Sequence, residues 1–349
     1  MIRKRVFIVI VLIVIFGFTA LCFIKILNKK ENEIIKKANN NENKKVSVWA
    51  VYWDLDRVPK EVSELEKHID NFCYFAAYYD NKNQLILPES TVKIFQYIEK
   101  KYDDKKWKNY LTVVNDKMIK DGVFSHKDTS LLYELFKSDE SIKKNTNQII
   151  SLALLGGYDG IEIDYEAIKK DMQLWRLYEK FCSYLYKKSS EAGLQLRVLL
   201  EPSAPIEKLM LPEGPDYVIM CYNLHGPNTK PGPKADKEFI RKLVEKMSVI
   251  PGKKEFALAT GGFDWDENGE VKAVTQLQAK EIIKEYNAET MRDDESCAIK
   301  FSYEDEKGKK HEVWYADMVT INCWIDIIEE YGSYGISIWR LGGNYYEEF

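Results

Sequence analysis

The chain contains the sequence Tyr158-Asp159-Gly160-Ile161-Glu162-Ile163-Asp164-Tyr165-Glu166. If it forms a β-strand, its side chains alternate between two faces, so Glu162, Asp164 and Glu166 share one face. Successive carboxylates on that face are then roughly 6.6 Å apart. Three acids that repel one another and resist desolvation raise the pKa of at least one of them. A protonated carboxyl beside an ionised one is the arrangement that glycoside cleavage requires.

Two other interpretations of this face remain open. A solvated edge strand carries charge without cost, although such edges usually mix lysine with acids, and this face has no cation. An acidic metal site is the second, because hard cations bind carboxylates. No histidine or further aspartate-rich loop completes a ligand set, so we predict no metal and no cofactor.

The pattern Asp-Gly-x-x-x-Asp-x-Glu on a strand resembles the signature of family 18 glycoside hydrolases, the chitinase family. The resemblance is specific at its end, Asp164-Tyr165-Glu166. It departs by one methylene at Glu162, where the family usually has aspartate. The acid chemistry is unchanged by this departure, but the way in which Asp164 is held could differ.

Eight apolar, strand-like runs alternate with mostly helical patterns between Val46 and the end of the chain. They are Val46–Trp53, Phe72–Tyr79, Tyr110–Asn115, Gly160–Glu166, Leu194–Glu201, Tyr217–Asn223, Phe256–Thr260 and Gly335–Trp339. Alternation of strands and helices predicts a parallel sheet, and eight repeats predict an α/β fold, the closed (β/α)₈ barrel, over residues 46–349.

Two irregularities modify the barrel. About 75 residues separate the seventh and eighth runs, and within them Ala298–Tyr303 and His311–Tyr315 flank a turn that is typical of a β-hairpin. We therefore predict a small α+β hairpin insertion at about residues 264–316. Only ten residues follow the eighth run, so the eighth helix is expected to be absent or very short.

An uncharged segment, Val6–Ile24, follows Arg3-Lys4-Arg5 and is long enough to span a bilayer. We predict a signal anchor over residues 1–24 and a polar linker over 25–45, with a cleaved signal peptide as the alternative. The catalytic domain is then expected outside the cytoplasm, anchored to the cell membrane or secreted. This location follows mainly from the expected function.

Charge and cysteine content exclude some functions. Beyond residue 45 the chain has 41 basic and 52 acidic residues, a net charge of about −11, which disfavours nucleic-acid binding. The six cysteines are Cys22, Cys73, Cys182, Cys221, Cys297 and Cys323. Their spacing favours buried free thiols and makes a disulfide framework or a zinc site improbable.

Catalytic residues of a barrel gather where the strands end. The sixth run ends in Met220-Cys221-Tyr222-Asn223, similar to the family's Met-x-Tyr-Asp motif, with Asn223 in place of aspartate. By resemblance, Tyr222 would donate to the acetamido oxygen of a substrate. Trp339 matches the tryptophan on which the family stacks the reacting sugar. Taken alone, each could simply be a packed core residue.

Further candidates lie at the ends of other runs. Tyr52 ends the first run, Glu201 ends the fifth, and Trp265 follows the seventh in an exposed-looking loop. We expect Glu162, Asn223 and Trp339 to bind substrate together with these three. Trp265 is the best candidate for an outer sugar platform.

The resemblance implies hydrolysis with retention and without a protein nucleophile. Glu166 would be the general acid, the substrate's 2-acetamido group would attack the anomeric carbon, and Asp164 would orient that group. The expected substrates are β-linked N-acetylglucosamine-containing glycans: chitin oligomers, peptidoglycan or glycoprotein glycans. The alternative is a catalytically weak or inactive, lectin-like carbohydrate-binding protein. We expect a monomer.

Overall fold

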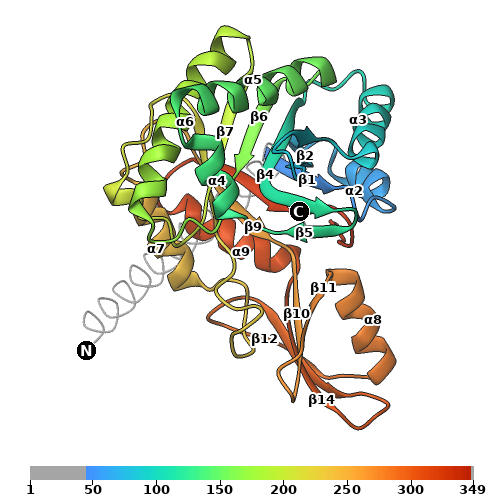
Figure 1. Ribbon diagram of the computed structural model, residues 1–349. Coiled ribbons are helices and arrows are strands. Elements are labelled where there is room, and N and C mark those ends of the chain that lie inside the picture. Colours follow the sequence, from blue (N-terminus) through green and yellow to red (C-terminus); the bar gives the residue numbers. More distant parts are fainter. Residues whose placement is uncertain (1–44, 347–349) are drawn as a thin grey trace, which may run out of the picture. The chain divides into compact units, whose positions relative to one another are not determined.

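Eight parallel strands close into a barrel in the computed structural model of the chain, which describes residues 45–346 (Figure 1). They are β1 (Val46–Val51), β2 (Ile69–Tyr79), β4 (Lys108–Lys120), β6 (Gly160–Asp164), β7 (Gln195–Leu200), β8 (Asp216–Met220), β9 (Lys254–Ala259) and β15 (Gly335–Trp339). Pairing of β15 with β1 closes the ring. Each strand overlaps one of the eight predicted runs, so the predicted barrel is confirmed.

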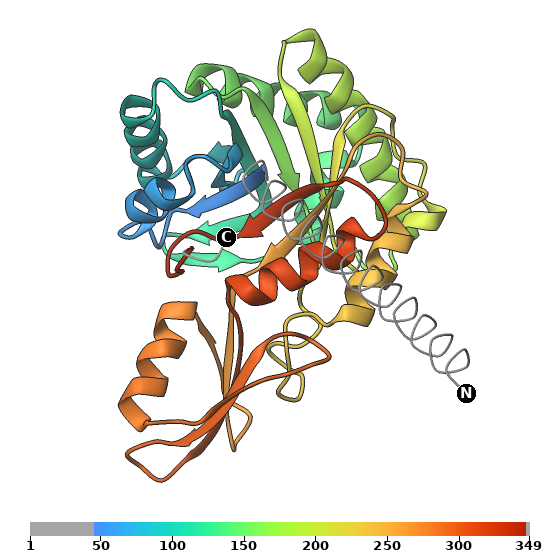
Figure 2. The ribbon, with the colours of Figure 1, turned by 180° about the vertical axis from the view of Figure 1, so that it is seen from behind.

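Helices cover the outside of the barrel, as both views show (Figures 1 and 2). They are α2 (Val58–Leu65), α3 (Glu89–Lys101), α4 (Thr129–Phe136), α5 (Asp139–Gly156), α6 (Met172–Glu191), α7 (Lys237–Met247) and α9 (Met318–Glu329), with one 3₁₀ turn, η1 (Ile206–Lys208). Local sequence sets their ends: the Ser138 hydroxyl caps the start of α5, and Gly157, with φ +78°, ends it.

The strand β6 divides its side chains between two cores. Ile161 and Ile163 face outward into the large apolar layer between barrel and helices. Glu162 and Asp164 alternate with them and are buried as well. A smaller cluster, which includes Trp49, fills the barrel interior. The predicted alternation of side chains along this strand is therefore confirmed.

Between β9 and β15 the chain builds a five-stranded sheet with one helix (Figure 1). Its elements are β10 (Gly261–Asp266), β11 (Val271–Val274), α8 (Gln276–Tyr286), β12 (Thr290–Arg292), β13 (Ile299–Glu304) and β14 (Lys310–Ala316). The predicted hairpin is confirmed as the antiparallel pair β13–β14. The insertion is larger than a hairpin and begins three residues earlier than predicted, because β10 pairs with β14 along its whole length.

A disulfide joins Cys297 to Cys323 in α9. The expectation that no disulfide forms is therefore wrong for this pair. The spacing of 26 residues gave no hint, because the insertion folds back on the barrel and brings the two Cα atoms to 6.6 Å. Cys73, Cys182 and Cys221 are buried free thiols, as predicted.

No helix follows β15 in the described part of the chain, as expected from its short tail. The buried carboxylate of Glu61, on α2, instead accepts hydrogen bonds from the backbone N–H groups of Gly342, Gly343 and Asn344, at 2.5–3.0 Å. One helical side chain thus satisfies the backbone donors of the last loop.

Two shorter strands extend the sheet beyond the barrel: β3 (Leu85–Ile86) pairs with β2, and β5 (Val123–Ser125) pairs with β4. The predicted anchor and all but Lys45 of the predicted linker lie outside the described residues. None of the helices in residues 45–346 is long and apolar enough to cross a membrane.

Candidate active site

A cavity of about 520 Å³ opens where the strands of the barrel end. Six of the predicted site residues line it: Tyr52, Asp164, Glu166, Tyr222, Asn223 and Trp339. They come from β1, β6, β8 and β15 or from the loops that directly follow these strands. The closed barrel therefore brings together residues that are up to 287 positions apart in the sequence.

Asp164 is the last residue of β6 and points into the barrel, with 6% of its surface exposed. Its Oδ1 atom is buried and has no hydrogen-bond partner among the described residues. Burial, followed by the charges of Glu166 and Glu162, holds the pKa of Asp164 well above its usual range. A proton on this carboxyl, or a donor from a ligand, would satisfy the unpaired oxygen.

Glu166 lies two residues beyond the end of β6. Its backbone is fixed by Asn115, whose side-chain amide accepts from the Glu166 N–H at 2.9 Å and donates to the Glu166 carbonyl at 3.1 Å. Its side chain is 13% exposed and accepts from the Lys127 ammonium at 2.7 Å. Burial alone would lower the pKa of Lys127, but the charge and hydrogen bond of Glu166, together with the charges of Asp164 and Glu201, outweigh it, and the pKa is raised.

Tyr222 and Trp339 contribute aromatic surface to the cavity. Tyr222 is buried, and burial together with the Asp164 charge raises the pKa of its hydroxyl well above 10, so the hydroxyl keeps its proton. The half-buried ring of Trp339 is held edge-on by Trp49 and Phe75, at centroid distances of 5.7 and 5.0 Å. The Trp339 ring therefore has a fixed orientation in the cavity that Asp164 and Glu166 also line.

Two further predicted residues lie at the rim of the cavity. Asn223 is exposed and has φ +71°, a left-handed conformation that asparagine tolerates better than most residues. The Tyr52 ring is half-buried and packs edge-on against Trp53, with a centroid distance of 4.8 Å. Both side chains line the cavity and remain accessible to solvent.

Glu162 is fully buried beneath the cavity and does not line it. Its carboxylate accepts from Trp49 Nε1 at 2.6 Å, Thr112 Oγ1 at 2.8 Å and Arg197 Nε at 2.9 Å. The prediction that Glu162 binds substrate is therefore wrong. The cation that the strand itself lacks comes from the neighbouring strand β7, where Arg197 pairs in register with Glu162.

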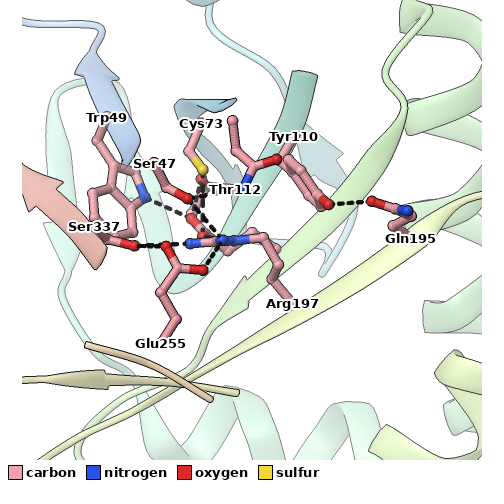
Figure 3. A network of polar contacts seen from close by, with 11 residues as sticks. Ser47, Trp49, Cys73, Tyr110, Thr112, Gln195, Arg197, Glu255 and Ser337 are labelled. Carbon is pink, nitrogen blue, oxygen red and sulfur yellow. Dashed lines mark hydrogen bonds and ion pairs between the residues drawn. The ribbon is translucent and has the colours of Figure 1, made fainter. Parts of the chain in front are cut away.

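Arg197 is the centre of this buried network (Figure 3). Its guanidinium pairs with the carboxylates of Glu162 and Glu255 and also donates to the hydroxyls of Ser47 and Ser337. These partners come from β6, β9, β1 and β15. One side chain thus connects four other strands of the barrel below the cavity.

The remaining two predicted residues do not line the cavity. Glu201 follows β7, and its Oε2 atom accepts from the backbone N–H of Ala167 at 2.8 Å, so it supports the loop that carries Glu166. Burial and the Glu166 charge raise the pKa of Glu201. Trp265 lies in β10, is 3% exposed and packs against Phe263. The prediction of an exposed sugar platform at Trp265 is wrong.

Sequence reasoning missed one wall of the cavity. Asn115, Asp116, His126 and Lys127 line it from β4 and from the residues that follow β5. Asn115 was recognisable, because it ends the third predicted run. The other three were not, since β4 continues to Lys120 and returns through β5. In residues 45–346 no group of three or more acidic, histidine or cysteine side chains is arranged to hold a metal ion.

Comparison with known proteins gives consistent likenesses in sequence. The chain is 25% identical to the uncharacterized glycosylase YvbX of Bacillus subtilis (strain 168) over 281 residues, which cover 75% of this chain and 77% of that protein. It is 26% identical to a cortical fragment-lytic enzyme of Bacillus anthracis over 64% of this chain and 55% of that enzyme. The chain thus spans about half the length of this second relative. No protein-family profile matches the chain.

Solved structures share the fold. The spore cortex-lytic enzyme SleL of Bacillus cereus has a TM-score of 0.69 and 21% identity, and the match covers 86% of this chain and 71% of that one. A class V chitinase of Nicotiana tobaccum, solved in complex with NAG4, has a TM-score of 0.67 and 16% identity over 86% of this chain and 94% of that one. The resemblance to family 18 glycoside hydrolases is confirmed, and so is the enzyme class, glycoside hydrolase.

Proposed function

We propose that this chain is a retaining hydrolase of β-linked, N-acetylglucosamine-containing glycans, with Glu166 as general acid and base. The observation that carries the proposal is the shared cavity. It contains a carboxylate on a fixed loop, a second acid with an unpaired buried oxygen, a protonated tyrosine and an oriented tryptophan ring. The relatives support it, since one of them is a chitinase solved with NAG4 and another acts on spore cortex.

The first half-reaction breaks the glycosidic bond. Glu166 gives its proton to the glycosidic oxygen, and the leaving sugar departs as an alcohol. The acetamido oxygen of the remaining sugar forms a new bond to the anomeric carbon, which gives an oxazolinium ion. Asp164 accepts a hydrogen bond from the acetamido N–H, while the Tyr222 hydroxyl donates to the acetamido oxygen.

The second half-reaction restores the enzyme. Glu166, now a carboxylate, takes a proton from water, and the resulting hydroxide equivalent attacks the anomeric carbon from the face that the leaving group vacated. The ring of the oxazolinium ion opens and the acetamido group reforms. Two inversions at the same carbon give net retention. Lys127 donates to the Glu166 side chain at 2.7 Å and is therefore positioned to orient it.

The location of the domain follows the same argument. The disulfide Cys297–Cys323 is typical of proteins that fold in an oxidising compartment outside the cytoplasm. A relative of the same fold is a spore cortex-lytic enzyme, which agrees with such a location. We therefore propose an extracytoplasmic catalytic domain, held at the membrane by residues 1–24 or released by their cleavage.

Substitution of the proposed acid tests the function. Glu166→Gln should lower kcat on N-acetylglucosamine oligomers by about 10²–10⁴-fold, because the amide cannot donate the required proton, while the Kd for the oligomer stays within a few-fold. Glu89→Gln is the matched control: Glu89 also accepts from a lysine at 2.7 Å, but on the exposed surface of α3. Unchanged turnover in Glu166→Gln would refute the proposal.

The same experiment distinguishes the hydrolase from the lectin-like alternative. A sugar-binding protein without catalysis would bind the oligomers, release no reducing ends and lose nothing on substitution of Glu166. Retention of the acid in a cavity with Asp164 and Tyr222 favours the enzyme.

A further inference from the structure

A second cavity, of about 370 Å³, adjoins the first. The two share Tyr222, Asn223 and Trp339 as lining residues, so they are neighbouring compartments of one cleft. The second compartment is bounded by the insertion as well as by the barrel, because Gly262, Phe263, Val274 and Thr275 also line it. A glycan stacked on Trp339 would reach both compartments.

Lys234 and Arg340 give the second cavity its charge. The Lys234 ammonium donates to the carbonyl of Thr260 at 2.8 Å and lies 5.3 Å from the centre of the Phe263 ring. No carboxylate in residues 45–346 forms an ion pair with it. The Arg340 guanidinium pairs with Asp54 at 2.8 Å. Asp54 therefore offsets one of the two cations, and the charge of Lys234 is left uncompensated.

The first cavity has the opposite character. Asp116, Asp164 and Glu166 line it. Lys127 pairs with Glu166, and His126 contacts Asp116. The cleft is thus acidic where bond cleavage is proposed and cationic beyond Trp339. A neutral glycan such as chitin has no group that would need a buried ammonium there.

We propose that the second cavity binds a carboxylate carried by the sugar next to the one held at Asp164 and Glu166. This inference rests on the proposed function and narrows its substrate class. The preferred substrates are then glycans in which N-acetylglucosamine alternates with a carboxylate-bearing amino sugar, as in peptidoglycan.

The state of the lysine agrees with such a ligand. Burial, followed by the positive charge of Arg340, lowers the pKa of Lys234 to about 7. Burial therefore disfavours the charged form of Lys234, and an anion that pairs with the ammonium would favour that form. Arg340 and Asp54 are the other charged groups that line this cavity.

Binding measurements test the proposal without requiring turnover. In the Glu166→Gln background, calorimetry gives Kd for a peptide-free tetrasaccharide with free lactyl carboxylates and for the same tetrasaccharide with those carboxylates reduced to alcohols. The carboxylate form should bind roughly tenfold more tightly, as expected for a charge-assisted hydrogen bond. Adding Lys234→Gln should abolish this preference, and Lys234→Arg should keep it.

Lys246→Gln is the matched control. Lys246 also donates to a backbone carbonyl, that of Pro202 at 2.7 Å, and burial lowers its pKa too, but it lines neither cavity. The preference should survive this substitution. Thermal unfolding of each variant shows whether a lost preference reflects a lost fold, and the Lys234→Arg rescue separates charge from shape.

The outcomes also separate this inference from the proposed function. Equal affinity for both tetrasaccharides, or a preference that survives Lys234→Gln, overturns the carboxylate site even if N-acetylglucosamine oligomers are hydrolysed. A lack of hydrolysis by the unsubstituted enzyme overturns the function, while the binding result still decides the site. In a tetrasaccharide that carries stem peptides, the lactyl carboxyl is converted to an amide. If this tetrasaccharide binds in a manner that depends on Lys234, a stem-peptide carboxylate occupies the site instead.

Discussion

Asp164 shows how burial inside a barrel changes the pKa of a carboxyl group. Its pKa is raised by burial and by two neighbouring acids, so the folded state binds the proton more tightly than the unfolded state does. The free energy of unfolding therefore falls as the pH rises from the unfolded-state value of about 3.9 through the raised pKa of the folded protein.

Asp164→Asn removes this effect, because the amide stays neutral at every pH. The variant should have a higher melting temperature than the unsubstituted protein at pH 8, and the difference should shrink as the pH approaches about 4. Circular dichroism melts across this range measure it. A difference that does not change with pH would mean that Asp164 titrates normally. Hydrolysis should be severely reduced at every pH.

At the same scale, a single sequence predicts some site residues and not others. The period of two along β6 was enough to place Asp164 in the barrel, and strand ends identified Tyr222 and Trp339. Glu162 was misassigned because its partner, Arg197, lies on another strand. Register between strands is set by the whole barrel and not by local sequence.

The Arg197 network acts at the level of elements, since one guanidinium connects β7 to four other strands (Figure 3). Arg197→Met should lower the free energy of unfolding by about 3–5 kcal/mol, because Glu162 and Glu255 are left buried and uncompensated. Urea unfolding measures the loss. Arg241→Met is the control: its pair with Glu330, at 3.7 Å, is exposed on both sides, and its loss should cost about 1 kcal/mol or less.

Adding Glu162→Gln and Glu255→Gln to Arg197→Met removes the two buried carboxylates that have lost their partner. The triple variant should therefore recover part of the lost free energy of unfolding. A triple variant as unstable as Arg197→Met would show that packing, and not charge, is what Arg197 supplies. If Arg197→Met has the same free energy of unfolding as the unsubstituted protein, the proposed role of the network is contradicted.

Elements were predicted well where local chemistry determines them. Apolar runs located all eight barrel strands. The continuation of β4 into the hairpin with β5 was missed, because its outer residues, Asp116–Lys120, are half-buried or exposed and show no alternation of apolar and polar side chains. That hairpin brings Lys127 to Glu166, so the missed element concealed a site residue.

For the whole molecule, the disulfide is the covalent link between the insertion and α9. The combined substitution Cys297→Ser and Cys323→Ser should lower the free energy of unfolding by about 3.5 kcal/mol, from the entropy of a loop of this length. Urea unfolding with and without a reductant measures it. Reduction should destabilise the unsubstituted protein to a similar extent and leave the variant unchanged. If reductant does not change the free energy of unfolding of the unsubstituted protein, the stabilising role of the disulfide is contradicted.

The substrate-assisted mechanism is tested most directly by proton NMR at early times of hydrolysis, with two β-linked oligosaccharides that differ only in the 2-acetamido group. The proposed mechanism predicts that the acetamido-bearing oligosaccharide releases the β-anomer first and that the one with a 2-hydroxyl is not cleaved. Initial release of the α-anomer, or efficient cleavage of the 2-hydroxyl oligosaccharide, would contradict it.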